Sequence, residues 1–168
     1  MSRVKLILDR TLAATICLLM AAMVVNVLWQ VLTRFILATP SSYTEELARY
    51  MMIWIGLLGG AYGVGQKSHL ALDLISTRLT GARQRVVAIF IALTVLVFAL
   101  AVLLGGGIRL VWISFALGQT SGALQIPLGY VYLVVPVSGV CVVFYAVGWL
   151  LEARSGQSAA AAQSGALN

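Results

Sequence analysis

Acidic residues are scarce in this chain of 168 residues, which holds five aspartates and glutamates against eleven lysines and arginines. Charged residues make up only 10% of the sequence and hydrophobic residues 61%, whereas soluble domains carry about 25% charged residues. A water-soluble globular fold therefore fits poorly. The composition favours a chain surrounded by lipid, in which each spanning helix needs about 20 mostly apolar residues.

Histidine and cysteine are almost missing as well. One histidine in the whole chain cannot supply the paired ligands of a membrane haem protein. Cys17 and Cys141 lie in separate apolar runs without CxxC spacing, so we interpret them as small apolar residues rather than a disulfide or metal pair. No GxxxxGK[ST] motif is present, which excludes ATP hydrolysis by this chain. We therefore predict that the chain is not an enzyme and binds no cofactor.

The net charge of +6 could suggest a nucleic-acid partner. However, the basic residues lie at the ends of apolar segments, and no basic stripe with interleaved aromatic residues appears. This distribution is typical of membrane topology, so no nucleic-acid partner is expected.

Four apolar segments are long enough to cross a membrane, and the fold class predicted is an all-α integral membrane protein. The predicted spans are about 11–34, 42–66, 86–112 and 127–151. The first follows basic residues as a signal peptide would, but its apolar stretch exceeds the 7–15 residues of a cleavable signal, so we expect an uncleaved span. Pro127 suits the start of the fourth span, and Pro136 should kink it.

The basic residues also predict an orientation. Eight of them lie on one side of the four spans and three on the other, and cytoplasmic loops carry the excess of lysine and arginine. Both termini are therefore expected in the cytoplasm. The eight are Arg3, Lys5, Arg10, Lys67, Arg78, Arg83, Arg85 and Arg154, and the three are Arg34, Arg49 and Arg109.

Two further segments complete the predicted layout of a membrane domain over residues 1–154. Residues 70–80 place apolar and polar side chains on opposite faces, which predicts a short amphipathic helix in the cytoplasmic interface. His69 and Asp73 stand one turn apart there, either to fix the start of that helix or as a proton-sensitive pair. Residues 155–168 are predicted to form a mobile cytoplasmic tail.

Two of the few acidic residues, Glu45 and Glu46, stand side by side where the second span begins. Ser42 and Glu45 have the spacing of a capping box, and Glu45 with Arg49 has the favourable i, i+4 order of an ion pair. Because this span is short, these charges should lie at the membrane boundary, where each needs a partner. Arg49 can serve one glutamate. The group either only caps and anchors the helix, or also docks a second subunit.

Two other patterns are candidates for subunit contacts. Asn26, Gln30 and Arg34 recur every fourth residue and form one polar stripe, which faces either the helices of this chain or another subunit. Gly56 and Gly60 have GxxxG spacing, and Gly59 with Gly63 repeats it, which lets another helix approach closely. The run at 105–107 is expected to mark flexibility or close packing rather than a phosphate loop.

Three stretches resemble a known family: WQVLTRF at 29–35, the long block from Ser41 to Leu74, and IPLGYVYLVVPVSG at 126–139. Together they are similar to the small, Q-type (DctQ-like) membrane subunit of tripartite ATP-independent periplasmic (TRAP) transporters. The most specific part is the E-E-L-A-R turn, the glycine-rich span and H-L-A-L-D. The likeness covers nearly everything except the tail.

The resemblance implies an accessory or scaffold subunit in the bacterial inner membrane. Its implied partners are a large multi-span subunit, which binds sodium and carries the solute, and a periplasmic binding protein that delivers an organic acid such as a C4-dicarboxylate. The alternative left open by the residues is a self-sufficient small transporter or channel working as a homo-oligomer. The sequence does not specify the substrate, the ion stoichiometry or the helix faces that contact the large subunit.

Overall fold

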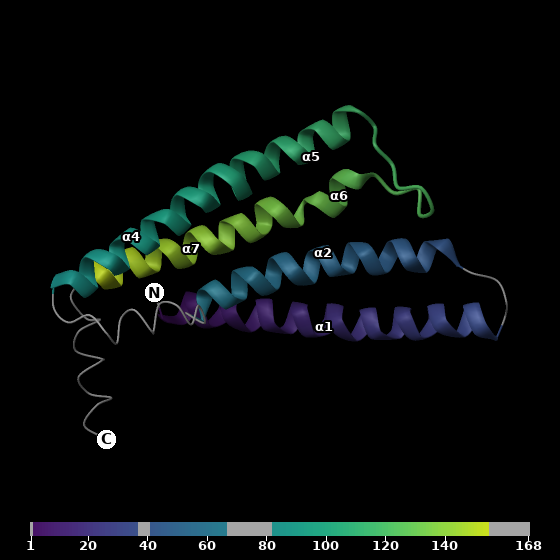
Figure 1. The fold of residues 1–168 in the computed structure, drawn as a ribbon, viewed down its shortest axis with the longest axis horizontal. Coiled ribbons are helices and arrows are strands. Elements are labelled where there is room, and N and C mark those ends of the chain that lie inside the picture. Colours follow the sequence, from purple (N-terminus) through teal and green to yellow (C-terminus); the bar gives the residue numbers. More distant parts are fainter. Residues whose placement is uncertain (1, 37–40, 67–81, 155–168) are drawn as a thin grey trace, which may run out of the picture.

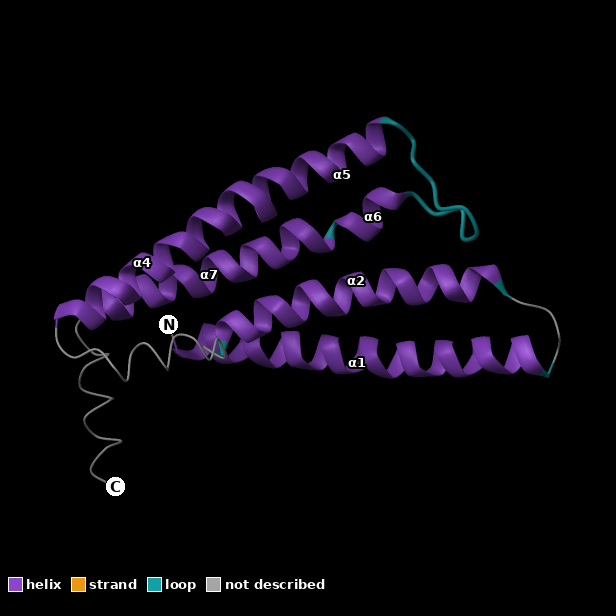
Figure 2. Ribbon diagram, viewed as in Figure 1, coloured by secondary structure: helices purple, strands orange, loops and turns teal. Residues whose placement is uncertain are grey.

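The computed structural model describes residues 2–36, 41–66 and 82–154. Nearly all of these residues are helical (Figures 1 and 2). The elements are α1 (Ser2–Phe35), α2 (Ser42–Gly65), α4 (Ala82–Phe98), the π-helix η1 (Ala99–Gly106), α5 (Gly107–Ala116), α6 (Leu128–Tyr132) and α7 (Val134–Arg154).

The predicted all-helical membrane fold is confirmed to the extent that four helical stretches are long and apolar enough to cross a bilayer in the described ranges. They are Arg3–Phe35, Ser42–Gly65, Val86–Ala116 and Leu128–Leu151. The predicted first span starts at about residue 11, but α1 begins at Ser2. The basic residues Arg3, Lys5 and Arg10 are therefore part of the helix. The predicted interfacial helix at 70–80 and the predicted tail at 155–168 lie outside the described residues.

The helices pack side by side in the order α1, α2, α7 and then the continuous stretch α4–η1–α5 (Figure 1). We call the end where α1 and α5 finish and α2 and α6 begin the loop end. The opposite end, where α1 and α4 begin and α2 and α7 finish, is the terminal end. Residues 117–127 connect α5 to α6 at the loop end (Figure 2).

α7 is the most buried of the four stretches. In its most apolar window 44% of the residues are buried, against 6% in α1. Val134 and Ala146 of α7 are completely buried, and Tyr145 is 3% exposed. α1 and α2 contribute Leu12, Leu58 and other side chains to the same core. Most of the apolar surface of α1 therefore faces outward, as lipid contact requires.

Two glycines let α7 and its neighbour approach closely. A Cβ atom at Gly139 would lie 2.9 Å from Leu103 Cβ and 3.2 Å from its backbone carbonyl carbon. A Cβ at Gly107 would lie 2.9 Å from Val135 Cγ1. Of the run at 105–107, close packing across helices therefore applies to Gly107, which faces α7 next to Pro136.

The fourth stretch is interrupted at Leu133, between α6 and α7. Proline has no N–H to donate to the carbonyl four residues earlier, and the ring of Pro136 crowds that carbonyl, which belongs to Tyr132. Trp54 of α2 supports this region, because its indole N–H donates to the Val131 carbonyl at 3.1 Å. The predicted disturbance at Pro136 therefore takes the form of a break one turn before it. Pro127 caps α6 from an extended conformation.

The π-helical segment η1 was not predicted. Its wider turns occupy Ala99–Gly106 in the middle of the third stretch. The apolar periodicity of that stretch is nearly featureless, so nothing in the sequence distinguishes a π-helix from an α-helix there.

Candidate functional site

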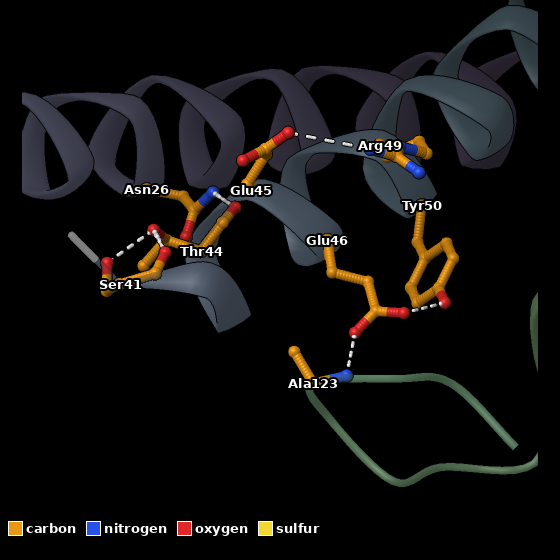
Figure 3. Close-up of polar contacts among 8 residues, drawn as sticks. All are labelled: Asn26, Ser41, Thr44, Glu45, Glu46, Arg49, Tyr50 and Ala123. Carbon is orange, nitrogen blue, oxygen red and sulfur yellow. Dashed lines mark hydrogen bonds and ion pairs between the residues drawn. The ribbon is translucent and has the colours of Figure 1, made fainter.

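The start of α2 differs from the predicted capping box, and its N-cap side chain makes no capping hydrogen bond. The N-cap residue is Ser41, in an extended conformation, and not Ser42. The hydroxyls of Ser41 and Thr44 lie 2.6 Å apart, and Thr44 Oγ1 donates to the Ser41 carbonyl at 2.8 Å. The predicted Ser42–Glu45 box is therefore wrong by one residue: the third position after the cap is Thr44, which is buried, and the Glu45 side chain points elsewhere (Figure 3).

The polar stripe of α1 does not act as one unit. Asn26 Nδ2 donates to the Thr44 carbonyl at 2.8 Å, so it joins α1 to the first turn of α2 (Figure 3). Gln30 is half-buried, and its backbone carbonyl accepts the Thr33 hydroxyl at 2.9 Å. Arg34 is exposed, with its guanidinium carbon 5.9 Å from the centre of the Phe35 ring. Asn26 therefore faces the helices of this chain, while Arg34 faces outward.

Glu46 holds the loop between α5 and α6 against α2. Its Oε1 accepts the Tyr50 hydroxyl at 2.6 Å and the Gly122 N–H at 3.1 Å. Its Oε2 accepts the N–H group of Ala123 at 2.7 Å (Figure 3) and that of Leu124 at 3.0 Å. One carboxylate thus satisfies three successive backbone amides that lie more than 70 residues away in sequence.

The loop is itself folded so that these amides converge. Ser121 N–H donates to the Ile126 carbonyl and Leu128 N–H to the Gln119 carbonyl, both at 2.9 Å. Gln125 adopts a φ of 54°, unusual for a residue other than glycine, and its side-chain amide donates to the Gly122 carbonyl at 2.9 Å. The result is a narrow turn with its N–H groups directed at Glu46.

Glu45 and Arg49 form a separate, outward-facing pair. Arg49 Nη2 lies 3.5 Å from Glu45 Oε1, and the two side chains are 67% and 66% exposed for Glu45 and Arg49 respectively. Figure 3 shows the two glutamates directed away from each other, Glu46 toward the loop and Glu45 toward Arg49. The carboxylate that the sequence left without a partner is therefore Glu46, and the structure gives it partners within the chain.

The glycines of α2 fall into two groups. Cβ atoms built at Gly56, Gly59, Gly60 and Gly63 would meet nothing within 4 Å. By contrast, a Cβ at Gly65 would lie 2.4–2.8 Å from the ring of Tyr145. The GxxxG pairs therefore do not pack against any described part of this chain.

A polar contact at the terminal end was not predicted from the sequence. The Tyr145 hydroxyl of α7 donates to Asp9 of α1, and Gly65 of α2 lies against the same ring. Asp9 lies near Lys5 and Arg10, and the basic residues dominate the local pattern. Pairing across 136 residues of sequence leaves no local signal that could have revealed it.

The described residues hold no further candidate site of the kinds that the sequence raised. His69 and Asp73 lie outside the described residues. In the part of the chain that the structure describes, no group of three His, Cys, Asp or Glu residues could hold a metal ion. Cys17 is exposed on α1 and Cys141 is buried in α7, and both are free thiols.

The family of the chain follows from its sequence over most of its length. Residues 23–156 match the family of tripartite ATP-independent periplasmic transporters, DctQ component. The chain belongs to this family. It is thus a multi-pass membrane protein and a small permease subunit of a bacterial TRAP transporter, a family of transport components and not of enzymes.

Three relatives of this DctQ chain are informative. The isethionate TRAP transporter permease protein DctMQ of Oleidesulfovibrio alaskensis is 35% identical over 101 residues, 60% of this chain and 16% of the relative. The sialic acid TRAP transporter small permease protein SiaQ of Vibrio cholerae is 32% identical over 88 residues, 52% of this chain and 51% of SiaQ. A putative TRAP transporter small permease protein of Haemophilus influenzae is 24% identical over 126 residues, 74% of this chain and 75% of the relative. The matched part of this chain thus spans about a sixth of the DctMQ relative and about half of SiaQ.

Proposed function

We propose that this chain is the accessory scaffold subunit of a TRAP transporter that takes up an organic acid together with sodium ions. In this proposal a large multi-span permease subunit carries the solute and binds the sodium, and a periplasmic binding protein delivers the solute. The observation that carries the proposal is the match to the DctQ component over residues 23–156. The DctMQ relative supports it, because its permease chain is far longer than the part that resembles this one.

The contacts of the three acidic side chains that the structure describes favour an accessory role over a carrier role. Ion-coupled carriers place carboxylates inside the membrane, where they face a partner or a water-filled path. Asp9, Glu45 and Glu46 lie near the ends of their helices and already bond within the chain, to Tyr145, Arg49 and the loop amides respectively. Sodium binding is therefore assigned to the large subunit.

We also propose the orientation. The excess of basic residues places the terminal end of the bundle, with both chain termini, in the cytoplasm. The loop end, with the Glu46-bound loop and the Glu45–Arg49 pair, then faces the periplasm. Gln119 is exposed at the loop end, so the variant Gln119→Cys should react in intact spheroplasts with a membrane-impermeant maleimide. Labelling only after the membrane is broken would show that the loop end faces the cytoplasm, opposite to the proposed orientation.

The proposed solute is an organic anion. C4-dicarboxylates, keto acids, sialic acid and isethionate form the panel to test, the last two because they appear in the names of relatives. None of the side-chain contacts described above selects among them, since the solute is carried by the large subunit in this proposal.

Reconstitution tests the function directly. Proteoliposomes would contain this chain alone, the partner large permease alone, or both chains together. Each preparation would receive the cognate binding protein and an inward sodium gradient. We expect uptake of one acid from the panel only when both membrane chains are present. Uptake by this chain alone would instead support a self-sufficient homo-oligomeric transporter and overturn the proposal.

A further inference from the structure

One face of α2 has no close neighbour among the described parts of the other helices over most of its length. Its residues follow one another in steps of four and three, as in the contact line of a coiled coil. We call this face the open seam. It consists of Glu45, Arg49, Met52, Gly56, Gly59 and Gly63, with Gly60 beside it.

Exposure varies along the seam: its charged residues, Met52 and Gly56 are exposed, whereas Gly59 and Gly63 are half-buried. The side chains of Glu45 and Arg49 are two-thirds exposed, and Met52 is 59% exposed. Below them, no described atom of another element lies within 4 Å of a Cβ built at any of the four glycines. The seam therefore combines one exposed ion pair at the loop end with a smooth glycine surface toward the terminal end.

The other faces of α2 are already used by this chain. Leu58, Ala61 and Gly65 are buried in the core, and Gly65 lies against Tyr145 of α7. Thr44 faces α1, where its carbonyl accepts Asn26. Glu46 faces the loop. Since each of these residues is committed to a neighbour, the seam is the part of α2 that remains for a partner.

Lipid alone does not account for the composition of the seam. A lipid-facing helix surface is usually made of large apolar side chains, as on α1, where Leu18, Val25 and Leu28 are exposed. Glycine weakens a helix and adds no apolar contact with lipid, but it allows a second helix backbone to come close. The exposed ion pair in the same register offers a charge-complementary contact to a polar side chain of that second helix.

We propose that the open seam is the surface on which a transmembrane helix of the large permease subunit packs. This inference rests on the proposed function and names the contact surface within it. The large permease is favoured over a second copy of this chain because the DctMQ relative contains a similar stretch within a much longer permease polypeptide. The permease helix would cross close to the glycines and place a polar side chain beside Glu45 and Arg49.

Substitutions that place a large side chain on the open seam test the proposed contact with the permease. Gly56→Leu and Gly60→Leu would be co-expressed with the tagged large permease and purified in mild detergent. Ala21→Leu and Ala101→Leu are the matched controls, because these small residues are exposed on α1 and η1. We expect recovery of the chain with the permease to fall at least roughly tenfold for the seam variants and to stay near wild type for the controls. Equal recovery of all four variants would overturn the proposal.

Cross-linking identifies the occupant. Met52→Cys, in a Cys17→Ser and Cys141→Ala background, would be oxidised in membranes that also hold single-cysteine variants of the permease. A disulfide to one permease helix is expected, whereas a disulfide only to a second Met52→Cys chain would overturn the proposal.

Thermal unfolding of each seam variant alone separates lost contact from lost fold, because the open space around the glycines predicts no loss of stability.

The two proposals can fail separately. If the wild-type chain co-purifies with the permease and supports uptake, but the seam variants do so equally, only the seam assignment fails. If the wild-type chain neither co-purifies with the permease nor affects uptake, the accessory role fails too.

Discussion

Eight helical glycines of this chain fall into two contrasting environments, and the contrast separates internal packing from surface left for a partner. At Gly65, Gly107, Gly129 and Gly139 an added Cβ would collide with a side chain of a neighbouring element at less than 3.0 Å. At Gly56, Gly59, Gly60 and Gly63 it would meet nothing within 4 Å. The same residue type brings helices together in the first group and leaves an outer surface bare in the second.

Both groups are represented in α2, which makes the comparison testable within a single helix. Gly63 and Gly65 are two residues apart in α2, yet only Gly65 contacts Tyr145. Residues two apart on a helix point in very different directions, which allows Gly65 to face the core while Gly63 faces the open seam. In the isolated chain, substitutions in the two groups should therefore have opposite consequences.

The largest effect is expected at Gly139. Gly139→Val would place methyl groups against Leu103, including its backbone, which cannot move aside without separating α7 from η1. We expect a loss of about 3 kcal/mol in unfolding free energy, at the upper end for overpacked cores. Thermal unfolding followed by circular dichroism in detergent measures it. Gly60→Val is the matched control, and equal loss in both variants would remove the distinction between the two groups.

Gly65→Ala should cost somewhat less, about 2 kcal/mol, because only the ring of Tyr145 stands in the way. The double variant with Tyr145→Leu tests the cause, since removing the ring should make the alanine nearly harmless. In the double-mutant cycle we expect a coupling energy of about 1 kcal/mol or more. Additive effects would show that Gly65 and Tyr145 do not compete for the same space.

Glu46→Gln should act locally and leave global stability largely intact. Losing the carboxylate weakens the hydrogen bonds to the amides of Gly122, Ala123 and Leu124, because bonds to a charged acceptor are the stronger ones. Hydrogen exchange of these amides should accelerate about tenfold. Glu45→Gln is the control and should leave the exchange unchanged, because Glu45 bonds to Arg49 outside the loop. Faster amide exchange in Glu45→Gln, with unchanged exchange in Glu46→Gln, would contradict the geometry of the two glutamates.

The smallest effect, and one of opposite sign, is expected at Gly56. Gly56→Ala adds a methyl group in open space and improves helix propensity, so the isolated chain should be as stable as wild type or more stable by up to about 1 kcal/mol. Thermal unfolding beside Gly65→Ala gives the comparison within one helix. Destabilisation by both substitutions would mean that α2 packs more tightly than described around Gly56.

Long apolar segments made the helical stretches predictable, because hydrophobic length is a local property of the sequence. The same locality explains the errors. Ser41 and Ser42 are equally good caps by composition, and only the position of Thr44 beneath α1 decides between them. The ion pair of Glu45 and Arg49 was predictable because it is a neighbouring-turn contact within one helix.

The candidate site depended on contacts that no local pattern contains. The sequence showed that two adjacent glutamates need partners, but the partners of Glu46 are backbone amides, which every residue possesses. Likewise, GxxxG spacing indicated that a helix could approach α2, yet Gly65 is the glycine that the chain uses at that end of the helix. Tertiary packing, and not residue type, decides which small residues remain open.

The most direct test of the account measures whether the open seam is covered in the assembled transporter. A nitroxide spin label at Met52→Cys, in the cysteine-free background, would report its accessibility to oxygen dissolved in the lipid, with a label at Phe90→Cys on α4 as reference, since both positions are exposed in this chain. We predict that adding the large permease sharply lowers oxygen access and mobility at position 52 in proteoliposomes. Unchanged access at position 52, in a complex that is assembled and transports its solute, would contradict the account.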